Sequence, residues 1–265
     1  MATKTISVHG KRVAVDIIGE GRPLLLVHGF PMDARMWSKQ LEPLGAAAKV
    51  ISPDLPGFGE SELPNSVMTP ANYADFLSDL LESLEINEAV TVCGLSMGGY
   101  IALEFWKRHP SLVNSLIFCH TKATSDTPEA IENRKKTADN ARRKGAEDLA
   151  RDMPVKLTSP DTQQNNIEVM EQLSSMIADQ PGPSIAAASL GMAQRANFVS
   201  FLPDIAVPAL IIAGDKDTLI PMTEMEMMAK VIPHAKFVVI KNSGHLSPME
   251  KPNEFNQDVL AFLAR

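Results

Sequence analysis

Residues 91–100 of this chain read TVCGLSMGGY. An apolar run leads into Ser96, and Gly94, Gly98 and Gly99 surround that serine. Glycine weakens both helices and strands, so three glycines at one point need a reason. A tight turn from a strand into a helix supplies it, because small residues let the backbone fold back on itself. The pattern G-x-S-x-G in that context is typical of a nucleophile elbow, a turn that holds a serine hydroxyl exposed.

Short apolar runs recur along the chain and predict a parallel sheet. None of them alternates apolar with polar residues, as expected for strands that are covered on both faces. These runs are PLLLVHG at 23–29, KVISPD at 49–54, AVTVCGLS at 89–96, SLIFCHT at 115–121, PALIIAGD at 208–215 and KFVVIKN at 236–242. The segment 4–18, KTISVHGKRVAVDII, alternates instead on both sides of His9 and Gly10 and predicts a hairpin.

Helical patterns lie between these predicted strands. Residues 69–84 begin with Thr69 and Pro70, and residues 97–109 end in cations before a proline, as helix termini favour. Strands that alternate with helices predict an α/β fold with a right-handed, mostly parallel sheet. Between 124 and 203 only helical patterns occur. We therefore predict a helical cap at 124–203, inserted into a core domain that is built from 1–123 and 204–265.

The composition limits the partners of the protein. With 265 residues, of which 45% are hydrophobic and 22% charged, the chain can bury a full core. A net charge of −7 argues against nucleic acid or an anionic membrane as the main partner. No window approaches the ~18 apolar residues of a membrane span, and the N-terminus has no apolar signal core. Cys93 and Cys119 lie in apolar runs, as free thiols do in a reducing compartment. We expect a cytoplasmic protein, either a monomer or a dimer.

A serine nucleophile needs a base, and the base needs a third group to orient it. His245 follows the last predicted strand, at the carboxyl edge of the sheet where open α/β sheets place their sites. The loop after the preceding strand offers two acids, Asp215 and Asp217. The chain order of serine, aspartate and histidine matches the order that this fold class uses. The histidines that we expect to be structural or solvated are His9, His109 and His234.

Five motifs together resemble those of α/β-hydrolases from the carboxylesterase and enol-lactonase-like branch. They are HGFPMDARMW at 28–37, DLPGFGES at 54–61, GLSMGG at 94–99, GDKDTLIP at 214–221 and SGHLSPMEKP at 243–252. The resemblance spans nearly the whole chain. It implies an eight-stranded, mostly parallel sheet flanked by helices, with an inserted helical cap. It also implies a serine hydrolase that needs no metal and no organic cofactor.

The resemblance assigns roles to individual residues. The family's acid-loop pattern resembles G-x-x-D-x-x-x-P, and it fits 214–221 with Asp217 as the acid and Asp215 as a turn residue. It further implies that the backbone N–H groups of Phe30 and Met97 form the oxyanion hole. The implied catalytic residues are Ser96, Asp217 and His245.

The substrate pocket is less defined by the sequence. The residues that we expect near it are His28, Pro31, His120, Leu95 and Leu246. We expect His28 to brace the oxyanion loop. His120 ends the strand before the cap, where it either faces the pocket or packs as a structural histidine.

The expected reaction is hydrolysis of small, short-acyl carboxylic esters by water through an acyl-enzyme. Enol-lactone hydrolysis and perhydrolysis would use the same triad, and Pro31 after the oxyanion residue resembles perhydrolase loops. A catalytically silent ligand receptor on the same fold is the alternative that is not an enzyme. Ser96 argues against the epoxide hydrolases and haloalkane dehalogenases of this fold, because their nucleophile is a carboxylate.

Overall fold

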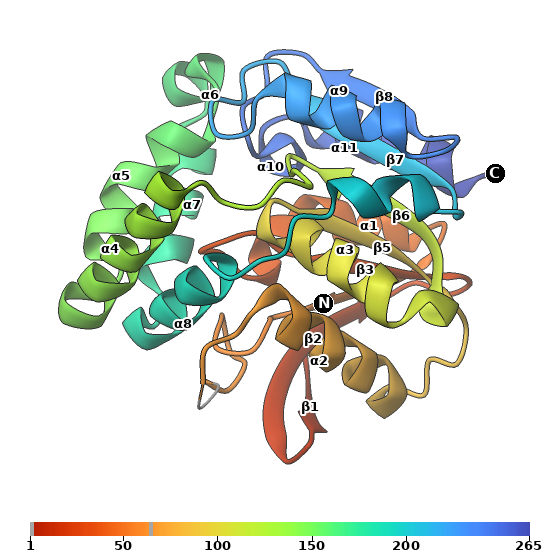
Figure 1. The fold of residues 1–265 in the computed structure, drawn as a ribbon, viewed down its shortest axis with the longest axis horizontal. Helices are drawn as coiled ribbons and strands as arrows, with labels where there is room; N and C mark the ends of the chain where they lie inside the picture. Colours follow the sequence, from red (N-terminus) through yellow and green to blue (C-terminus); the bar gives the residue numbers. More distant parts are fainter. Residues whose placement is uncertain (1–2, 64–65) are drawn as a thin grey trace.

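An eight-stranded sheet forms the centre of the molecule in the computed structural model, which describes residues 3–63 and 66–265 (Figure 1). The strands are Lys4–Val8 (β1), Lys11–Ile18 (β2), Pro23–Val27 (β3), Lys49–Pro53 (β4), Val90–Leu95 (β5), Val113–Cys119 (β6), Ala209–Gly214 (β7) and Lys236–Ile240 (β8). Their order across the sheet is β1-β2-β4-β3-β5-β6-β7-β8. β2 pairs antiparallel with both β1 and β4, and every other pair is parallel. The predicted mostly parallel sheet is confirmed.

The central strands explain why the sequence lacks alternation. In β3, Leu25 and Val27 belong to one hydrophobic core, whereas Leu24 and Leu26 belong to the other. Successive side chains of a strand point to opposite faces, so a sheet with a core on each face needs an apolar residue at every position. The hairpin at the N-terminus turns at His9 and Gly10, as predicted, with φ angles of 49° and 76°.

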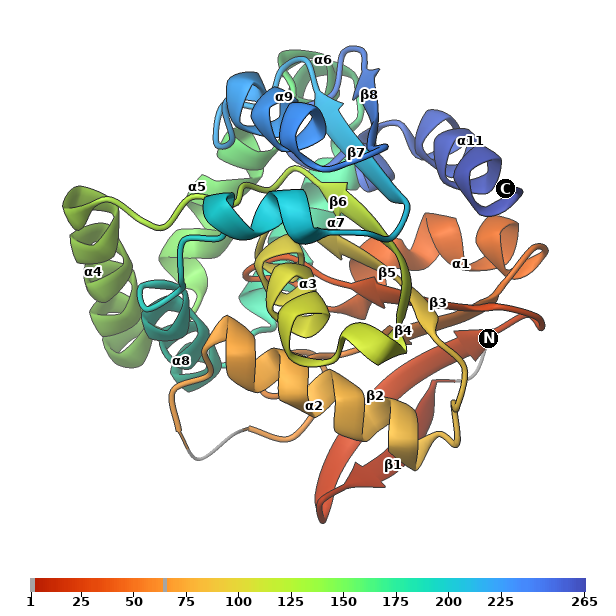
Figure 2. The same ribbon diagram turned by 45° about the vertical axis from the view of Figure 1, so that its right-hand side comes forward.

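Helices cover both faces of this sheet (Figure 2). α2 and α3 pack side by side on one face, and α1 and α11 pack together on the other. The helices of the sheet domain are Ser38–Gly45 (α1), Pro70–Ser83 (α2), Met97–Arg108 (α3), Met222–Val231 (α9), Ser247–Glu250 (α10) and Pro252–Leu263 (α11). Three short 3₁₀ helices cover Ala34–Trp37, Pro110–Leu112 and Val199–Asp204.

Side-chain hydrogen bonds fix the residue at which α2 begins. Thr69 Oγ1 accepts a hydrogen bond from Asn72 N at 3.2 Å, and Asn72 Oδ1 accepts one from Thr69 N at 3.0 Å. These reciprocal bonds satisfy N–H groups that the helix leaves unpaired, and such a cap contributes about 1 kcal/mol. Pro70 occupies the first turn, where its missing N–H costs nothing.

A helical insertion leaves the sheet after β6 and returns before β7. It contains Pro128–Lys144 (α4), Glu147–Leu157 (α5), Pro160–Asn165 (α6), Ile167–Ala178 (α7) and Gly182–Met192 (α8). α4 packs on α8 and α5 packs on α7, and these helices lie to the left of the sheet in Figure 1. The insertion is confirmed, and the domain boundaries at 124 and 203 stay a prediction.

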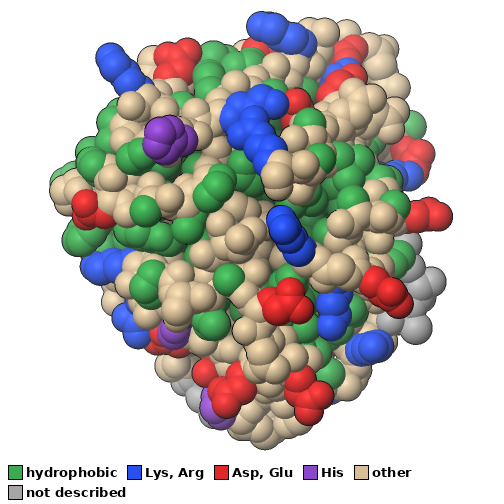
Figure 3. Space-filling view, turned by 90° about the vertical axis from the view of Figure 1, so that its right-hand side faces the viewer, with side chains coloured by type: hydrophobic (Ala, Val, Ile, Leu, Met, Phe, Trp, Pro, Cys, Tyr) green, Lys and Arg blue, Asp and Glu red, His purple; other side chains and the backbone are tan. Residues whose placement is uncertain are grey.

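Charged side chains of both signs lie on the surface, and the two cysteines lie inside the protein. On the face shown in Figure 3, cationic and anionic side chains are interspersed among apolar and uncharged groups. Cys93 and Cys119 are free and buried, with their sulfur atoms 3.8 Å apart. Within residues 3–63 and 66–265, no helix is both long enough and apolar enough to cross a membrane.

Candidate active site

Ser96 lies in the turn between β5 and α3, and its backbone is strained. Its φ angle is 55° and its ψ angle −109°, a conformation that costs a residue other than glycine roughly 1–3 kcal/mol. Two hydrogen bonds hold it there: Ser96 N donates to Cys119 O at 2.9 Å, and Thr121 Oγ1 donates to Ser96 O at 2.8 Å. The residue is half-buried, at the carboxyl edge of the sheet.

Two of the neighbouring glycines are required by close backbone contacts. A Cβ atom on Gly94 would collide with the carbonyl oxygen of Gly98. A Cβ atom on Gly98 would collide with the carbonyl oxygen of Val27, on the adjacent strand β3. The strand and the helix therefore approach each other as closely as the turn at Ser96 demands. This close approach explains why glycines, which weaken helices and strands, occupy positions 94 and 98.

His245 and Asp217 meet at the same edge of the sheet. His245 follows β8, and its Nδ1 lies 2.8 Å from Asp217 Oδ2 in the loop after β7. The other carboxylate oxygen, Oδ1, accepts the backbone N–H groups of Leu219 at 2.9 Å and Ile220 at 3.0 Å. Burial alone would raise the pKa of the Asp217 carboxyl, but the facing His245 and the hydrogen bonds from His120 and His245 hold it well below its usual range. Asp217 is therefore a carboxylate at neutral pH.

The structure brings Asp217 to His245 and leaves Asp215 apart. Asp215 forms an ion pair with Lys216 at 3.4 Å, and its buried Oδ1 has no hydrogen-bond partner among residues 3–63 and 66–265. Its backbone N–H donates to Ile240 O at 3.2 Å, which joins the end of β7 to β8. This arrangement fits the expectation that Asp215 is a turn residue.

His120 approaches the same carboxylate from the end of β6. Its Nδ1 lies 3.1 Å from Asp217 Oδ2, and its Nε2 lies 2.7 Å from Ser247 Oγ. The side chain is fully buried, and burial lowers the pKa of His120, so the ring is neutral. One carboxylate oxygen thus serves two histidines, an arrangement that the sequence alone did not predict.

These three side chains also have the geometry of a possible ligand group. In the described ranges, His120, Asp217 and His245 bring nitrogen and oxygen atoms that bind metals within 4.8 Å of one another. Both Nδ1 atoms already face Asp217 Oδ2 at hydrogen-bond distance. A metal ion would have to displace the protons that lie between them. The hydrogen bonds explain the grouping, and the prediction that no metal is needed stays a prediction.

Glu250 fixes the loop that carries His245, a role that our sequence analysis missed. Its Oε1 accepts the N–H of Gly244 at 2.8 Å, and its Oε2 accepts the N–H of Ser159, in the cap, at 2.7 Å. His245 N also donates to Leu157 O at 2.8 Å. The histidine loop is therefore bound to the inserted helices as well as to the sheet. Glu250 lies within the motif SGHLSPMEKP, but nothing in the sequence identifies its partner in the cap.

His245 Nε2 is the nitrogen left to act on a hydroxyl, because Nδ1 is engaged by Asp217. In the part of the chain that the structure describes, it makes no hydrogen bond to Ser96 Oγ. Contacts of this kind are often long in unliganded enzymes and tighten when substrate binds. Ser96 follows β5 and His245 follows β8, so both lie at the carboxyl edge of the sheet.

The loop after β3 carries the predicted oxyanion donor Phe30, in a cis peptide bond with Pro31. Among the described residues, neither Phe30 N–H nor Met97 N–H bonds to another backbone group. His28 braces this loop: its Nδ1 lies 3.0 Å from Gly29 O, and its Nε2 accepts the N–H of Leu55 at 3.0 Å. The accepted bond requires a neutral ring, and burial lowers the pKa of His28 to about 4.

We predict that His28→Gln makes stability less sensitive to acid. Between the ordinary histidine pKa of 6.5 and the folded value of about 4, the unfolded chain binds a proton that the folded protein does not. The contribution of neutral His28 to the free energy of unfolding is therefore complete above pH 6.5 and falls by up to about 3 kcal/mol as the pH drops to 4. Glutamine keeps an acceptor for Leu55 N–H but does not titrate. Urea unfolding at pH 4.5 and 7 measures how much the free energy of unfolding changes with pH. A change in His28→Gln as large as that in the wild type and in the exposed control His234→Gln would contradict the prediction.

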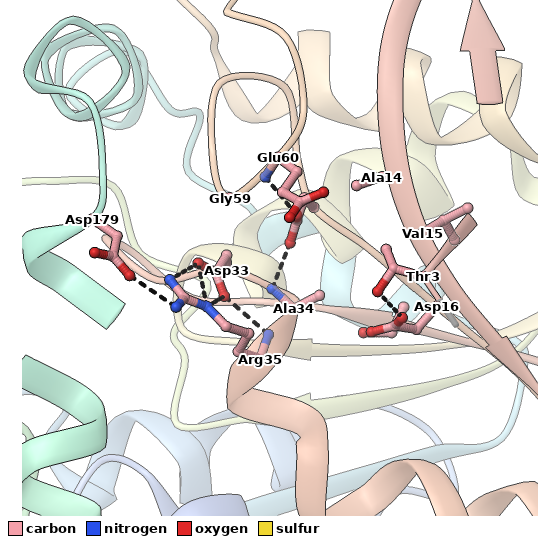
Figure 4. Close-up of a pocket in the computed structure, with 12 residues that line it drawn as sticks. Thr3, Ala14, Val15, Asp16, Asp33, Ala34, Arg35, Gly59, Glu60 and Asp179 are labelled. Carbon is pink, nitrogen blue, oxygen red and sulfur yellow. Dashed lines mark hydrogen bonds and ion pairs between the residues drawn. The ribbon is translucent and has the colours of Figure 1, made fainter. Parts of the chain in front are cut away.

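A cavity of about 310 Å³ lies beside the loop that carries Phe30 (Figure 4). In it the Arg35 guanidinium lies between Asp33 and Asp179, with hydrogen bonds of 2.7 Å to Asp33 Oδ2 and 2.9 Å to Asp179 Oδ2. Neither Ser96 nor any other predicted site residue lines this cavity. Its walls are rich in carboxylates, and its contacts tie the loop after β3 to the end of α7 in the cap. We assign it a structural role.

The predicted pocket residues are all buried. Leu95 and Leu246 belong to the hydrophobic core on the face of α1 and α11, and Pro31 is buried in the loop after β3. His28 and His120 use both ring nitrogens in contacts within the protein. Their place in a substrate pocket stays a prediction.

The sequence of this chain is similar to that of a known protein family. A family model described as the alpha/beta hydrolase fold matches residues 22–252. The chain belongs to this family. The eight-stranded sheet and the helical insertion are thus the features of an α/β hydrolase, as the resemblance implied.

Several relatives of this α/β hydrolase are known. It is 41% identical to a thermophilic esterase from Thermogutta terrifontis solved with malate bound, with 99% of this chain and 97% of that chain covered and a TM-score of 0.95. It is 25% identical to the enol-lactonase from Burkholderia xenovorans, with 99% and 100% covered and a TM-score of 0.92. It is 28% identical to 3-oxoadipate enol-lactonase 1 of Acinetobacter baylyi, with 96% and 94% covered. The family thus includes both esterases and enol-lactonases among its members close to this chain.

Proposed function

We propose that this α/β hydrolase is a serine esterase that cleaves carboxylic esters of small, short-acyl substrates. The observation that carries the proposal is the 2.8 Å contact between His245 Nδ1 and Asp217 Oδ2 at the sheet edge where Ser96 is held at positive φ. A base that a carboxylate orients, beside a serine in a strained turn, is the constellation that activates a hydroxyl.

The proposed mechanism transfers an acyl group to water. Neutral His245 takes the proton of Ser96 through Nε2 as the hydroxyl oxygen attacks the ester carbonyl. Asp217 keeps the proton of His245 on Nδ1 and stabilises the imidazolium that forms. The N–H groups of Phe30 and Met97 bind the oxyanion, at ~3–4 kcal/mol for each donor. His245 then protonates the leaving alcohol. Water attacks the acyl-enzyme and gives its proton to His245; the ester bond to Ser96 breaks, the carboxylic acid leaves, and His245 returns the proton to Ser96 Oγ.

Enol-lactone hydrolysis is the second candidate, and the two enol-lactonases among the relatives favour it. A lactone is a cyclic ester, so the same nucleophile, base and oxyanion donors would act, and the leaving group would stay attached to the acyl chain. Pro31 follows the proposed oxyanion residue Phe30, which resembles perhydrolase loops and keeps perhydrolysis as a variant of the same chemistry.

A substrate panel tests the proposal. Purified protein is assayed with p-nitrophenyl esters of rising acyl length, with enol-lactones alongside. We expect the highest kcat/KM at short acyl groups. A maximum at long-chain esters with interfacial activation would contradict the assignment. Colour release that stays at the uncatalysed rate for every ester would favour a silent ligand receptor.

For the acid, we predict that Asp217→Asn lowers turnover on the order of 10⁴-fold. The amide can donate to the imidazole, which favours the wrong tautomer of His245, while the side chain keeps its shape. The matched control is Asp215→Asn, two residues away on the same loop, and it should change turnover far less. Steady-state rates of the two variants decide the matter, and a reversed order of effects would mean that the acid is Asp215.

A further inference from the structure

The proposed mechanism leaves one part of the site unused. His120 and Ser247 are both fully buried, and they connect to Asp217 through contacts of 3.1 Å and 2.7 Å. The chain of contacts runs from Ser247 Oγ through the His120 ring to Asp217 Oδ2, and from there to His245 Nδ1. A buried imidazole with a partner at each nitrogen is held in one orientation, because losing either partner would leave a polar group unsatisfied.

The protonation of this chain follows from its chemistry. Asp217 is a carboxylate and can only accept, so His120 and His245 both carry a proton on Nδ1 and donate it. A neutral imidazole has one N–H. His120 Nε2 must therefore accept, and Ser247 Oγ donates to it. Ser247 thus selects the tautomer of His120 that places a donor on Asp217.

We propose that His120, anchored by Ser247, is a positioning residue that holds Asp217 Oδ2 toward His245 and spreads its negative charge over two donors. The inference rests on the proposed function, since it concerns the triad of that reaction. His120 touches Asp217 and Ser247, and it acts on the substrate only through the triad.

The backbone around His120 supports a fixed position. Its φ angle is 48°, in the left-handed region, and its N–H donates to Ile212 O of the neighbouring strand β7 at 3.0 Å. Ser247 begins α10, two residues after His245. His120 therefore joins the end of β6 to the acid loop and to the loop of His245. These are the three segments whose relative placement sets the geometry of the base.

The second donor also has an electrostatic effect. A hydrogen bond to a carboxylate disperses its charge, and a carboxylate with less charge stabilises a neighbouring imidazolium less. Removing the His120 donor should therefore leave more of the negative charge of Asp217 facing His245. The titratable groups that face His120 are Asp217, His245 and Glu250, and the His120 and His245 ring centroids lie 5.6 Å apart. Glu250 accepts the backbone N–H of Gly244 in the loop of His245. The contact on Asp217 Oδ2 that a substitution of His120 can remove is the donor from His120 Nδ1.

Two substitutions separate the two nitrogens of the ring. Asparagine places an amide near the position of Nδ1, and it tolerates a positive φ angle. His120→Asn thus keeps the donor to Asp217 and loses Ser247. Glutamine reaches toward the position of Nε2, so His120→Gln keeps a contact with Ser247 and removes the donor to Asp217.

The test compares pH profiles of kcat/KM for the ester substrate. We expect His120→Asn to keep the acid limb of the wild type. We expect His120→Gln to move that limb to higher pH and to lower kcat about tenfold with little change in KM, because the base and not the substrate contact is altered. Identical profiles for both variants, or a wild-type profile and kcat for His120→Gln, would overturn the proposal.

Two further measurements keep the test decisive. If either ring variant fails to fold by circular dichroism, Ser247→Ala replaces it, with a smaller shift of the acid limb expected and an unchanged profile overturning the proposal. Nitrogen-15 NMR of the histidine side chains reads the tautomers without any substrate. Nδ1–H on both His120 and His245 is expected, and Nε2–H on His120 would overturn the inference. An inactive wild type with both Nδ1 protons present would contradict the proposed function and leave the geometry of His120 standing.

Discussion

We expect Ser96→Ala to lower turnover by up to about 10⁶-fold and to leave the protein folded. The triad members act as one unit, so removing the nucleophile removes nearly all of their joint effect. The change deletes a single oxygen, and alanine meets the same backbone strain as serine at a φ angle of 55°. Stability should therefore stay within about 0.5 kcal/mol of the wild type. Initial rates of p-nitrophenyl acetate hydrolysis and a thermal melt measure the two quantities.

The control for this substitution is a buried serine elsewhere in the same sheet. Ser115 lies in β6, and its hydroxyl is 2.8 Å from Thr91 Oγ1 in β5. Ser115→Ala removes the same atom from a residue outside the proposed site, and we expect activity to change by a few-fold at most. Esterase activity that survives in a contamination-free preparation of Ser96→Ala would refute the elbow assignment.

His245→Ala should cost about as much as Ser96→Ala, because no base remains to activate the hydroxyl. The burst of p-nitrophenol that precedes steady state should disappear, since acylation itself fails. His28→Ala and His120→Ala should each leave a measurable burst, because neither ring takes the serine proton in the proposed mechanism. Stopped-flow measurements on the three variants make the comparison. A burst that survives in His245→Ala but vanishes in His120→Ala would mean that the base is His120.

The serine turn could be predicted from the sequence because its causes are local. Gly94 and Gly98 are needed for contacts with neighbouring backbone, and the apolar run before Ser96 has the length of a strand. The helix over 97–109 was predicted to end before Pro110, and α3 ends at Arg108. Patterns of this kind depend on residues a few positions apart, which is the range over which backbone geometry and capping act.

The contacts around Asp217 and Glu250 could not be predicted in this way. His120 lies 97 positions from Asp217, and Ser159 lies 91 positions from Glu250. Such pairs form only because the sheet order brings β6 beside β7 and the helical insertion folds back onto the loop after β8. The family resemblance indicates Asp217 as the acid, whereas the spacing of the residues alone does not distinguish Asp217 from Asp215. The lining of a substrate pocket depends in the same way on how the inserted helices pack against the sheet, which local patterns do not encode.

Ser96 should carry the acyl group during turnover, and peptide mass spectrometry detects such a group on the protein. The protein is mixed with p-nitrophenyl acetate, quenched in acid during the burst and digested. We predict an acetyl group on the peptide that contains Ser96, present in the wild type and missing in both Ser96→Ala and His245→Ala. Turnover without any acetylated peptide, or an acetyl group on another residue whose removal abolishes turnover, would contradict the account.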